Sequence, residues 1–450
     1  MKELFGTDGI RGKANTYPIT PEIALQVGKA IAKSFGAKGH GSARAVIGKD
    51  TRLSGYMLET ALTSGLVSMG MDVFEIGPLP TPAIAHLTKS LNANCGIMIT
   101  ASHNPSDDNG IKIFGSDGFK LPDEVELDIE SQVLGGEITS AHIGTEKIGK
   151  AFRIEDARGR YIEFAKSSIG NHSLKGLKIV LDCANGSAYY IAPLIFSELG
   201  ANVIKIGTEP NGYNINLNCG ATHTQTVSEA VIKHGADLGI ALDGDADRVI
   251  FCDSKGKIVN GDRIIGICAL DMKRRKRLAK NTVVVTSMTN LGFHKAMKDH
   301  GIKVETTDVG DRYVIERMRS KGYNLGGEQS GHIIFMDYVT TGDGIITALH
   351  LLKIMLENGK ELAKVADFME EYPQLLTNIP VKRKIPLKEI PGLHKLIDEC
   401  SASLEGKGRA VVRYSGTENK ARILVEAEKE SDVQKWTKKI KECLEKELCK

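Results

Sequence analysis

The fold is decided by five consecutive segments: LKIVLDCA (177–184), SAYYIAPLIFSELG (187–200), ANVIKIG (201–207), VSEAVIKHG (227–235) and LGIAL (238–242). The first, third and fifth segments are short apolar runs typical of strands, and the other two have the length and spacing of helices. Strands that alternate with helices in this way predict βαβ units, in which mostly parallel strands are covered by helices.

The same rhythm appears in residues 43–99 and again in residues 281–335. The chain has 450 residues, well beyond the ~250–300 at which single domains usually stop growing. We therefore predict three α/β domains with mixed, mostly parallel sheets. After Pro373 the pattern changes to strands interleaved with two helices, which predicts a C-terminal α+β domain. The predicted domains are residues 1–154, 155–254, 255–372 and 373–450.

The charge of the chain is nearly balanced, with 59 Lys and Arg against 56 Asp and Glu and a formal net charge of +3. This balance supplies no global field for nucleic acid or a membrane surface. No stretch approaches the ~20 apolar residues of a membrane span, and the N-terminal MKELFGTDGIRG lacks the apolar run of a signal peptide. We expect a cytoplasmic protein with no nucleic-acid or membrane partner, either a monomer or a homodimer.

The segment LGIALDGDADRVIF (238–251) carries three carboxylates at alternate positions, Asp243, Asp245 and Asp247, directly after an apolar strand. Ligands that offer only oxygen on a tight loop suit a hard divalent cation, Mg²⁺ first. An EF-hand is excluded, because Arg248 and Ser254 stand where that loop needs Gly and Glu. The alternative is an acidic, solvated turn.

The segment CGIMITASHNPSDDNGIKIFG (95–115) places Ser102 just beyond a buried strand, where α/β sheets have their ligand crevice. Neighbours on an extended chain point apart, so no dyad of Ser102 with His103 is expected. Ser102 has no other evident local base, which favours a serine that carries a phosphoryl group. The alternative is an ordinary turn serine.

Glycines flank Glu328, Ser330 and His332 in NLGGEQSGHIIF (324–335). An acceptor, a hydroxyl and an imidazole on one tight loop suit the hydroxyls of a sugar. His332 is also a candidate general acid or base, because its ordinary pKa lies near working pH. The alternative is a structural histidine at the start of a strand.

The segment RYSGTENKAR (413–422) combines two arginines with a loop that glycine lets approach a ligand closely. Arginine makes forked, charge-assisted bonds to phosphate. We expect one phosphate to be bound by Arg413, Ser415, Gly416, Thr417 and Arg422. The alternative is a hairpin turn with surface arginines.

Together these segments resemble the α-D-phosphohexomutase superfamily over essentially the whole chain. The motifs that carry the resemblance follow one another in the superfamily's order: TASHNP (100–105), DGDADR (243–248), GEQSGH (327–332) and R-x-S-G-T-E (413–418). Within it, LFGTDGIRG (4–12), TTDVGDRYV (306–314) and Gln329 resemble the bacterial phosphoglucosamine mutase branch. The chain departs from the pattern at Tyr414 and Asn419, where the phosphate loop usually has prolines.

The resemblance implies a heart-shaped molecule with three similar α/β domains, a fourth α+β domain and a central cleft. It implies that phosphorylated Ser102 exchanges its group with a hexosamine phosphate, interconverting glucosamine 6-phosphate and glucosamine 1-phosphate through a 1,6-bisphosphate, for UDP-N-acetylglucosamine synthesis. Hexose 1,6-bisphosphate is then expected as an activator. One Mg²⁺ would be held by a phosphoserine oxygen and the three aspartates.

The remaining implied roles belong to the loops around the serine. Positive charge near the transferred group would come from Arg248 and Arg11. Protons would be handled by His332, Lys112 and His103, and sugar hydroxyls would be bound by Glu328 and Ser330. Three other functions remain open: a phosphomannomutase/phosphoglucomutase, a non-catalytic protein that binds sugar phosphates, and a metal-dependent phosphatase.

Overall fold

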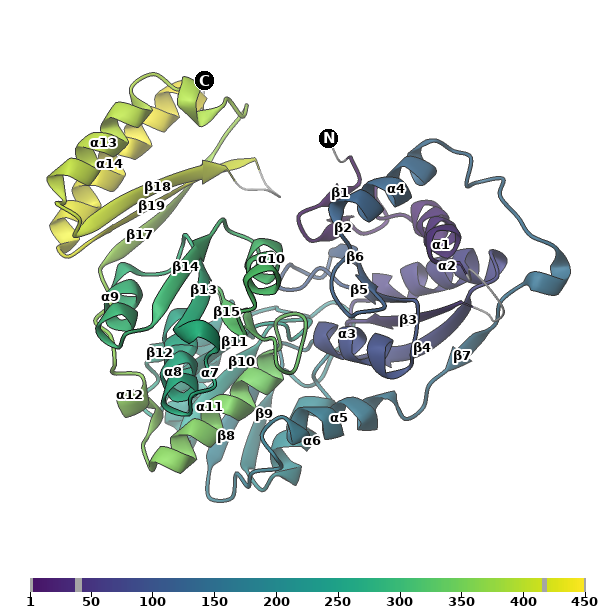
Figure 1. The fold of residues 1–450 in the computed structure, drawn as a ribbon, viewed down its shortest axis with the longest axis horizontal. Coiled ribbons are helices and arrows are strands. Elements are labelled where there is room, and N and C mark those ends of the chain that lie inside the picture. Colours follow the sequence, from purple (N-terminus) through teal and green to yellow (C-terminus); the bar gives the residue numbers. More distant parts are fainter. Residues whose placement is uncertain (1–2, 37–42, 415–418, 449–450) are drawn as a thin grey trace. The chain divides into compact units, whose positions relative to one another are not determined.

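The structure, a computed structural model, describes residues 3–36, 43–414 and 419–448. The chain folds into two compact units, Met1–Thr286 with Ile302–Asp367, and Ser287–Gly301 with Phe368–Lys450 (Figure 1). The first unit contains three sheets covered by helices and the second contains one small antiparallel sheet, as the sequence predicts. Among the described residues, no helix combines the length and the hydropathy needed to cross a bilayer.

The first sheet has seven strands in the order β1-β2-β6-β5-β3-β4-β7. Four of them, β5, β3, β4 and β7, are parallel, and β6 is antiparallel to both β5 and β2. The strands are β1 (Phe5–Gly6), β2 (Gly9–Lys13), β3 (Arg44–Lys49), β4 (Asp72–Pro78), β5 (Cys95–Ile99), β6 (Asp108–Gly115) and β7 (Ala151–Arg153). Its helices are α1 (Pro21–Phe35), α2 (Ser54–Ser68), α3 (Thr81–Ser90) and α4 (Asp123–Leu134), with a 3-10 turn at Thr145–Lys147.

One apolar core joins α1, α2 and α4 to one face of this sheet. Helices α1 and α2 pack closely because glycines face each other between them. A Cβ at Gly28 would lie 2.5 Å from the Leu62 carbonyl, and one at Gly65 would lie 2.2 Å from the Leu25 carbonyl. A larger residue at either position would push the two helices apart.

The second and third sheets repeat the parallel plan with fewer strands, in the orders β12-β11-β10-β8-β9 and β14-β13-β15-β16. The second comprises β8 (Lys178–Asp182), β9 (Asn202–Ile206), β10 (Leu238–Leu242), β11 (Val249–Asp253) and β12 (Ile258–Val259), with α5 (Ala157–Ser167), α6 (Ile191–Glu198) and α7 (Thr224–His234). The third comprises β13 (Thr282–Thr286), β14 (Lys303–Thr307), β15 (Leu325–Gly327) and β16 (Ile333–Phe335), with α8 (Gly261–Arg274), α10 (Asp311–Lys321), α11 (Gly344–Asn358), α12 (Leu362–Val365) and a 3-10 turn at Ala279–Asn281.

The three sheets share one feature that positions the site. In each, a buried strand continues into a loop and returns as an antiparallel neighbour: β5 into β6, β10 into β11, and β15 into β16. The intervening loops are residues 100–107, 243–248 and 328–332, which are the three motif segments of the first unit. The α/β prediction is therefore confirmed, and each predicted loop occupies the equivalent place in its sheet.

The second unit packs α13 (Leu393–Ser403) and α14 (Glu430–Leu448) on a sheet of β17 (Gln374–Pro380), β19 (Lys420–Ala427) and β18 (Gly408–Tyr414), with a 3-10 turn at Leu387–Glu389. It also contains α9 (Leu291–Asp299), which follows β13 in the chain. Buried Glu426 on β19 accepts the Leu291 amide at 2.6 Å, and Asn290 donates to the Tyr372 carbonyl at 3.0 Å. These contacts fix α9 to the C-terminal sheet, which local sequence patterns do not reveal.

Candidate active site

Two of the predicted loops meet in the first unit. The hydroxyl of Ser102, from the β5–β6 loop, donates to Oδ2 of Asp243, from the β10–β11 loop, at 2.7 Å. Both residues are buried. The serine and the aspartate loop, which the sequence places 141 residues apart, therefore form one site.

Ser102 has a left-handed backbone, with φ of +52°. A non-glycine residue pays ~1–2 kcal/mol for this conformation, so the surrounding contacts must hold it. Its amide donates to the Thr100 hydroxyl at 2.9 Å. The turn also corrects one expectation: because Ser102 is not extended, the Nδ1 atom of His103 lies 3.3 Å from the Ser102 Oγ. Burial, with the charges of Arg248 and Arg11, lowers the pKa of His103 to about 3.

Asp243, Asp245 and Asp247 converge as the sequence predicts. One oxygen from each lies within 4.8 Å of the others, and all three residues are buried. Oδ1 of Asp245 and Oδ1 of Asp247 are buried without a hydrogen-bond partner. Three converging carboxylates, two of them with a buried oxygen that accepts no hydrogen bond, fit a hard divalent cation. The alternative of a solvated acidic turn is wrong.

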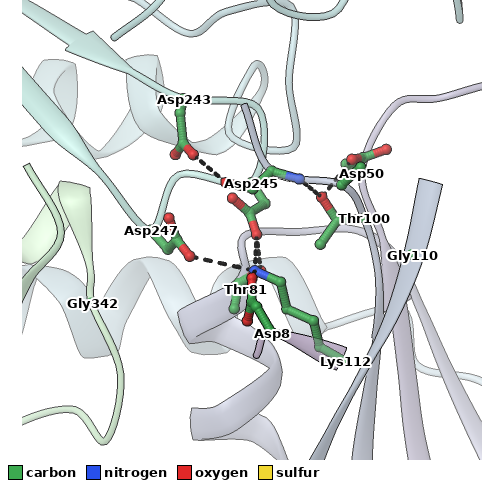
Figure 2. Close-up of polar contacts among 12 residues, drawn as sticks. Asp8, Asp50, Thr81, Thr100, Gly110, Lys112, Asp243, Asp245, Asp247 and Gly342 are labelled. Atoms are coloured by element: carbon green, nitrogen blue, oxygen red, sulfur yellow. Dashed lines mark hydrogen bonds and ion pairs between the residues drawn. The ribbon is translucent and has the colours of Figure 1, made fainter. Parts of the chain in front are cut away.

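Cations surround this carboxylate cluster. Figure 2 shows the Lys112 ammonium facing Asp245 and Asp247, with Nζ···Oδ2 distances of 2.9 and 3.5 Å. Lys112 is buried on β6 and also lies 3.3 Å from Asp8. Burial lowers the pKa of Lys112, but the three carboxylates outweigh burial and the net shift is upward.

The two arginines expected near the serine are also present. Arg11 pairs with Asp8 and donates to the Ala101 carbonyl at 3.3 Å, directly before Ser102. Arg248 places its amide 3.1 Å from Asp243 Oδ1 and its Nε 3.7 Å from Asp247 Oδ1. Positive charge therefore lies on both sides of the serine and the carboxylates.

The pKa values of Asp243 and Asp247 shift in opposite directions. Burial and the repulsion from Asp247 and Asp245 raise the pKa of Asp243 well above its ordinary value. Burial alone would raise the pKa of Asp247 too, but Lys112 and His332 hold it well below the usual range. Repulsion of this kind is relieved when a cation binds among the oxygens.

The third loop lies against the second. The Val249 amide donates to the Gly331 carbonyl at 3.0 Å. His332 is buried, with Nδ1 3.6 Å from Asp247 Oδ1, and its Nε2 accepts the Gly342 amide at 3.1 Å. Burial lowers the pKa of His332, but Asp247 and Asp311 outweigh burial and the net shift is upward. His332 thus contacts a carboxylate of the cluster rather than Ser102.

Glu328 and Ser330 form the tip of the third loop. Glu328 Oε1 accepts the Gly310 amide at 3.1 Å, and Oε2 lies 3.3 Å from the Ser330 hydroxyl. Gln329, which marks the resemblance to one branch, donates to the buried Asp262 at 2.9 Å. The Gln329 amide therefore braces the loop against α8.

The predicted phosphate loop belongs to the second unit. Arg413 on β18 and Arg422 on β19 are direct cross-strand partners, so their side chains leave the same face of the sheet. Ser415, Gly416 and Thr417 lie outside the described residues.

Sequence reasoning missed several residues of the site. Asp8 pairs with Lys112, Lys120 and Arg11. Thr81, at the start of α3, donates to Asp245 Oδ2 at 2.6 Å. Asp8 lies in the LFGTDGIRG motif, which could have marked it as a site residue. Thr81 lies at the start of a helix with no motif around it, so the sequence carries no signal for its role.

Comparisons with known proteins agree with this architecture. The phosphoglucomutase/phosphomannomutase alpha/beta/alpha domains I, II and III match residues 2–138, 159–256 and 260–372, and the C-terminal domain matches residues 376–442. The phosphoglucosamine mutase of Citrifermentans bemidjiense is 54% identical over 443 residues, which cover 98% of this chain and 97% of that protein.

Solved structures share the fold. A phosphoglucomutase/phosphomannomutase family protein of Burkholderia thailandensis has a TM-score of 0.81 at 23% identity, covering 99% of this chain and 98% of that one. The N-acetylphosphoglucosamine mutase of Aspergillus fumigatus, solved with GlcNAc-6P and magnesium, has a TM-score of 0.68 at 19% identity, covering 99% and 96%. The chain therefore belongs to the phosphoglucomutase/phosphomannomutase family of isomerases and, within it, to the phosphoglucosamine mutases.

Proposed function

We propose that this chain interconverts glucosamine 6-phosphate and glucosamine 1-phosphate by exchanging phosphoryl groups with Ser102. The observation that supports this most directly is the 2.7 Å contact between the Ser102 hydroxyl and Asp243, inside a buried cluster of carboxylates and cations. The substrate class is taken from the relatives, which bear the name phosphoglucosamine mutase.

One Mg²⁺ is proposed to be held by Asp243, Asp245 and Asp247 with an oxygen of the phosphoserine. When bound, it would balance charge on the transferring group and on the serine oxygen. The Oδ1 atoms of Asp245 and Asp247, which are buried and accept no hydrogen bond, support this ligand set, as does the magnesium in the related Aspergillus complex. Arg11 and Arg248 supply the fixed positive charge around it.

The transfer step is balanced by the chain's own groups. A free sugar hydroxyl forms a bond to phosphorus while the bond from phosphorus to Ser102 Oγ breaks. The proton of the sugar hydroxyl leaves to a base, and the serine oxygen gains a proton. His103, 3.3 Å from Oγ, is proposed to handle the serine proton. His332 and Lys112, which lie beside Asp247 and Asp245, are proposed to handle the proton of the sugar hydroxyl.

The first transfer yields a 1,6-bisphosphate, which returns its other phosphate to Ser102 after turning over. Hexose 1,6-bisphosphate is accordingly proposed to activate dephosphorylated enzyme. Glu328 and Ser330 are proposed to bind sugar hydroxyls, and Arg413, Ser415, Gly416, Thr417 and Arg422 to anchor the phosphate that is not reacting. Arg413 and Arg422 are direct cross-strand partners, so both side chains leave the same face of the sheet, where one phosphate could accept from both guanidinium groups.

A single preparation tests this function against its neighbours. The values of kcat/KM for glucosamine, glucose and mannose phosphates, assayed with Mg²⁺ and a trace of bisphosphate, are expected to be highest for glucosamine phosphates. A preference for mannose or glucose phosphates would make the chain a phosphomannomutase/phosphoglucomutase. Net phosphate release without isomerisation would make it a phosphatase. If the chain shows neither isomerisation nor phosphate release, it would be a non-catalytic protein that binds sugar phosphates.

A further inference from the structure

Arg52 is fully buried, yet its guanidinium is committed almost entirely to the main chain of the loop that carries Ser102. We infer that Arg52 is a positioning residue for phosphoryl transfer, which holds the Ser102 hydroxyl at the carboxylate cluster. The inference rests on the proposed function of Ser102 and assigns a role to a residue outside the four motifs.

Every N–H group of the guanidinium has a partner. Nε donates to Asp50 Oδ2 at 2.9 Å. Nη2 donates to the carbonyls of Ser102 at 3.1 Å and Asn104 at 2.8 Å. Nη1 donates to the carbonyls of Pro105 and Asp108, the latter at 3.0 Å. Four carbonyls of residues 102–108 thus converge on one cation, which gathers the loop around a single centre.

Asp50 links Arg52 to the amide of Ser102 through Thr100. Its Oδ2 accepts the Thr100 hydroxyl at 2.6 Å, and that hydroxyl accepts the Ser102 amide at 2.9 Å; Figure 2 shows Asp50 beside Thr100. Both the amide and the carbonyl of Ser102 are therefore tied to the Arg52–Asp50 pair. Such double fixation explains how Ser102 keeps its left-handed backbone.

A residue from the region of the second sheet also binds the main chain of the serine loop. Buried Asn216 lies in the segment between β9 and α7, and its Nδ2 donates to the carbonyls of Ser102 at 2.9 Å and Asn104 at 3.0 Å. These are the two carbonyls that Arg52 Nη2 also binds. The serine loop is consequently held from its own sheet by Arg52 and from the neighbouring one, which carries the aspartates, by Asn216.

These contacts predict an effect on the reaction beyond folding. The partners of the guanidinium are Asp50 and four main-chain carbonyls, and they include neither Ser102 Oγ nor Asp243, Asp245 or Asp247. Arg52 therefore acts by fixing the place of the hydroxyl. Displacement of a reacting group by ~1 Å can cost ~100-fold in rate. Lysine at position 52 keeps the charge beside Asp50 but lacks the planar fork that spans four carbonyls.

The test compares Arg52→Lys, Asn216→Ala and Ser102→Ala with the wild type, and uses Arg263→Lys as the control. Arg263 is a buried arginine on α8 that donates to the Ala366 carbonyl, a main-chain acceptor far from the serine loop in the sequence. Uptake of phosphate by Ser102 from glucose 1,6-bisphosphate is followed by intact mass. Turnover is divided by the measured amount of phosphoserine, so that loss of folded protein does not enter the rate.

We expect Arg52→Lys to lower kcat per phosphoserine by ~100-fold, with KM within about threefold of wild type. Asn216→Ala is expected to lower it by ~10-fold, because Arg52 still binds both carbonyls. The looser loop should also raise the ratio of phosphate released to sugar isomerised, a quantity that reduced stability alone does not change. Arg263→Lys should match wild type in all three quantities.

Wild-type kcat per phosphoserine in folded Arg52→Lys would overturn the inference. If Arg52→Lys does not fold, Asn216→Ala decides: an unchanged rate and an unchanged release ratio would overturn it. An active Ser102→Ala variant would instead overturn the proposed function, and the positioning role with it. An inactive Ser102→Ala beside a wild-type-like Arg52→Lys removes the positioning role alone.

Discussion

Ser102 Oγ and Asp243 Oδ2 lie 2.7 Å apart across 141 residues of sequence. The contact joins the turn after β5 to the turn after β10, each at the end of a fully buried strand. Rigid strands therefore fix both partners, and the proposed phosphoryl transfer is placed where two sheets present equivalent turns to each other.

Asp245 should be indispensable for the metal. Asp245→Asn is expected to abolish the Mg²⁺ dependence of the residual activity and to lower turnover at least ~100-fold. It should also remove most of the increase in Tm that Mg²⁺ gives the wild type, because losing one of three carboxylate ligands weakens Mg²⁺ binding to the folded protein. Calorimetric titration with Mg²⁺ and thermal unfolding check both results. Normal Mg²⁺ stabilisation of the variant would contradict the ligand set.

Arg422 should act on the anchored phosphate rather than on Ser102. Arg422→Gln is expected to raise KM for glucosamine phosphate ~10- to 100-fold, which corresponds to the loss of ~1.5–3 kcal/mol from a charged hydrogen bond. Stored phosphoserine, measured by mass in the purified variant, should stay at the wild-type level. A variant with normal KM would exclude the anchor role. Lys429→Gln, beyond the end of β19, provides a charge-matched control.

His350 should make the protein sensitive to mild acid. Burial lowers the pKa of His350 to about 4, while its ring stacks on Phe335 at 4.7 Å. Between pH 6.5 and 4 the His350 imidazole binds a proton in the unfolded chain but not in the folded one. The free energy of unfolding is therefore unaffected by this group above pH 6.5 and falls as the pH decreases to 4. The loss amounts to ~3 kcal/mol at most.

His350→Phe keeps a stacked ring and removes the proton site. The variant is therefore expected to show a shallower fall in the free energy of unfolding between pH 6.5 and 4, measured by urea titration at several pH values. Activity at pH 7 should be retained. Identical pH dependence in variant and wild type would contradict the lowered pKa of this partly buried ring.

Tyr161 should stabilise the contact between α5, a helix of the second sheet, and α11, a helix of the third. Its hydroxyl, on α5, donates at 2.8 Å to Asp343, the capping residue of α11, and both side chains are buried. Tyr161→Phe leaves the Asp343 oxygen without this donor and is expected to cost ~1–3 kcal/mol of unfolding free energy. Denaturant titration measures the cost, and kcat should be unchanged. An unchanged stability would mean that water replaces the hydroxyl.

The strands and helices could be predicted from apolar periodicity, because that periodicity is local. The meeting of the serine and aspartate loops could be expected only from the resemblance to the superfamily. Other features required the fold. Arg52 approaches four carbonyls that lie about fifty residues further along the chain, and no local pattern encodes that contact. The approach of His103 to Ser102 depends on a positive φ that spacing does not reveal. Helix α9 follows a strand of the first unit yet packs in the second through buried Glu426.

The central claim concerns the chemical state of one hydroxyl. Intact-mass analysis with peptide mapping of the active enzyme tests it directly, before and after incubation with glucosamine 6-phosphate and Mg²⁺. We expect an increment of one phosphate, mapped to Ser102, that exchanges with labelled substrate phosphate at a rate at least equal to kcat. An active enzyme that carries no phosphate on Ser102, or whose Ser102→Ala variant turns over normally, would contradict it.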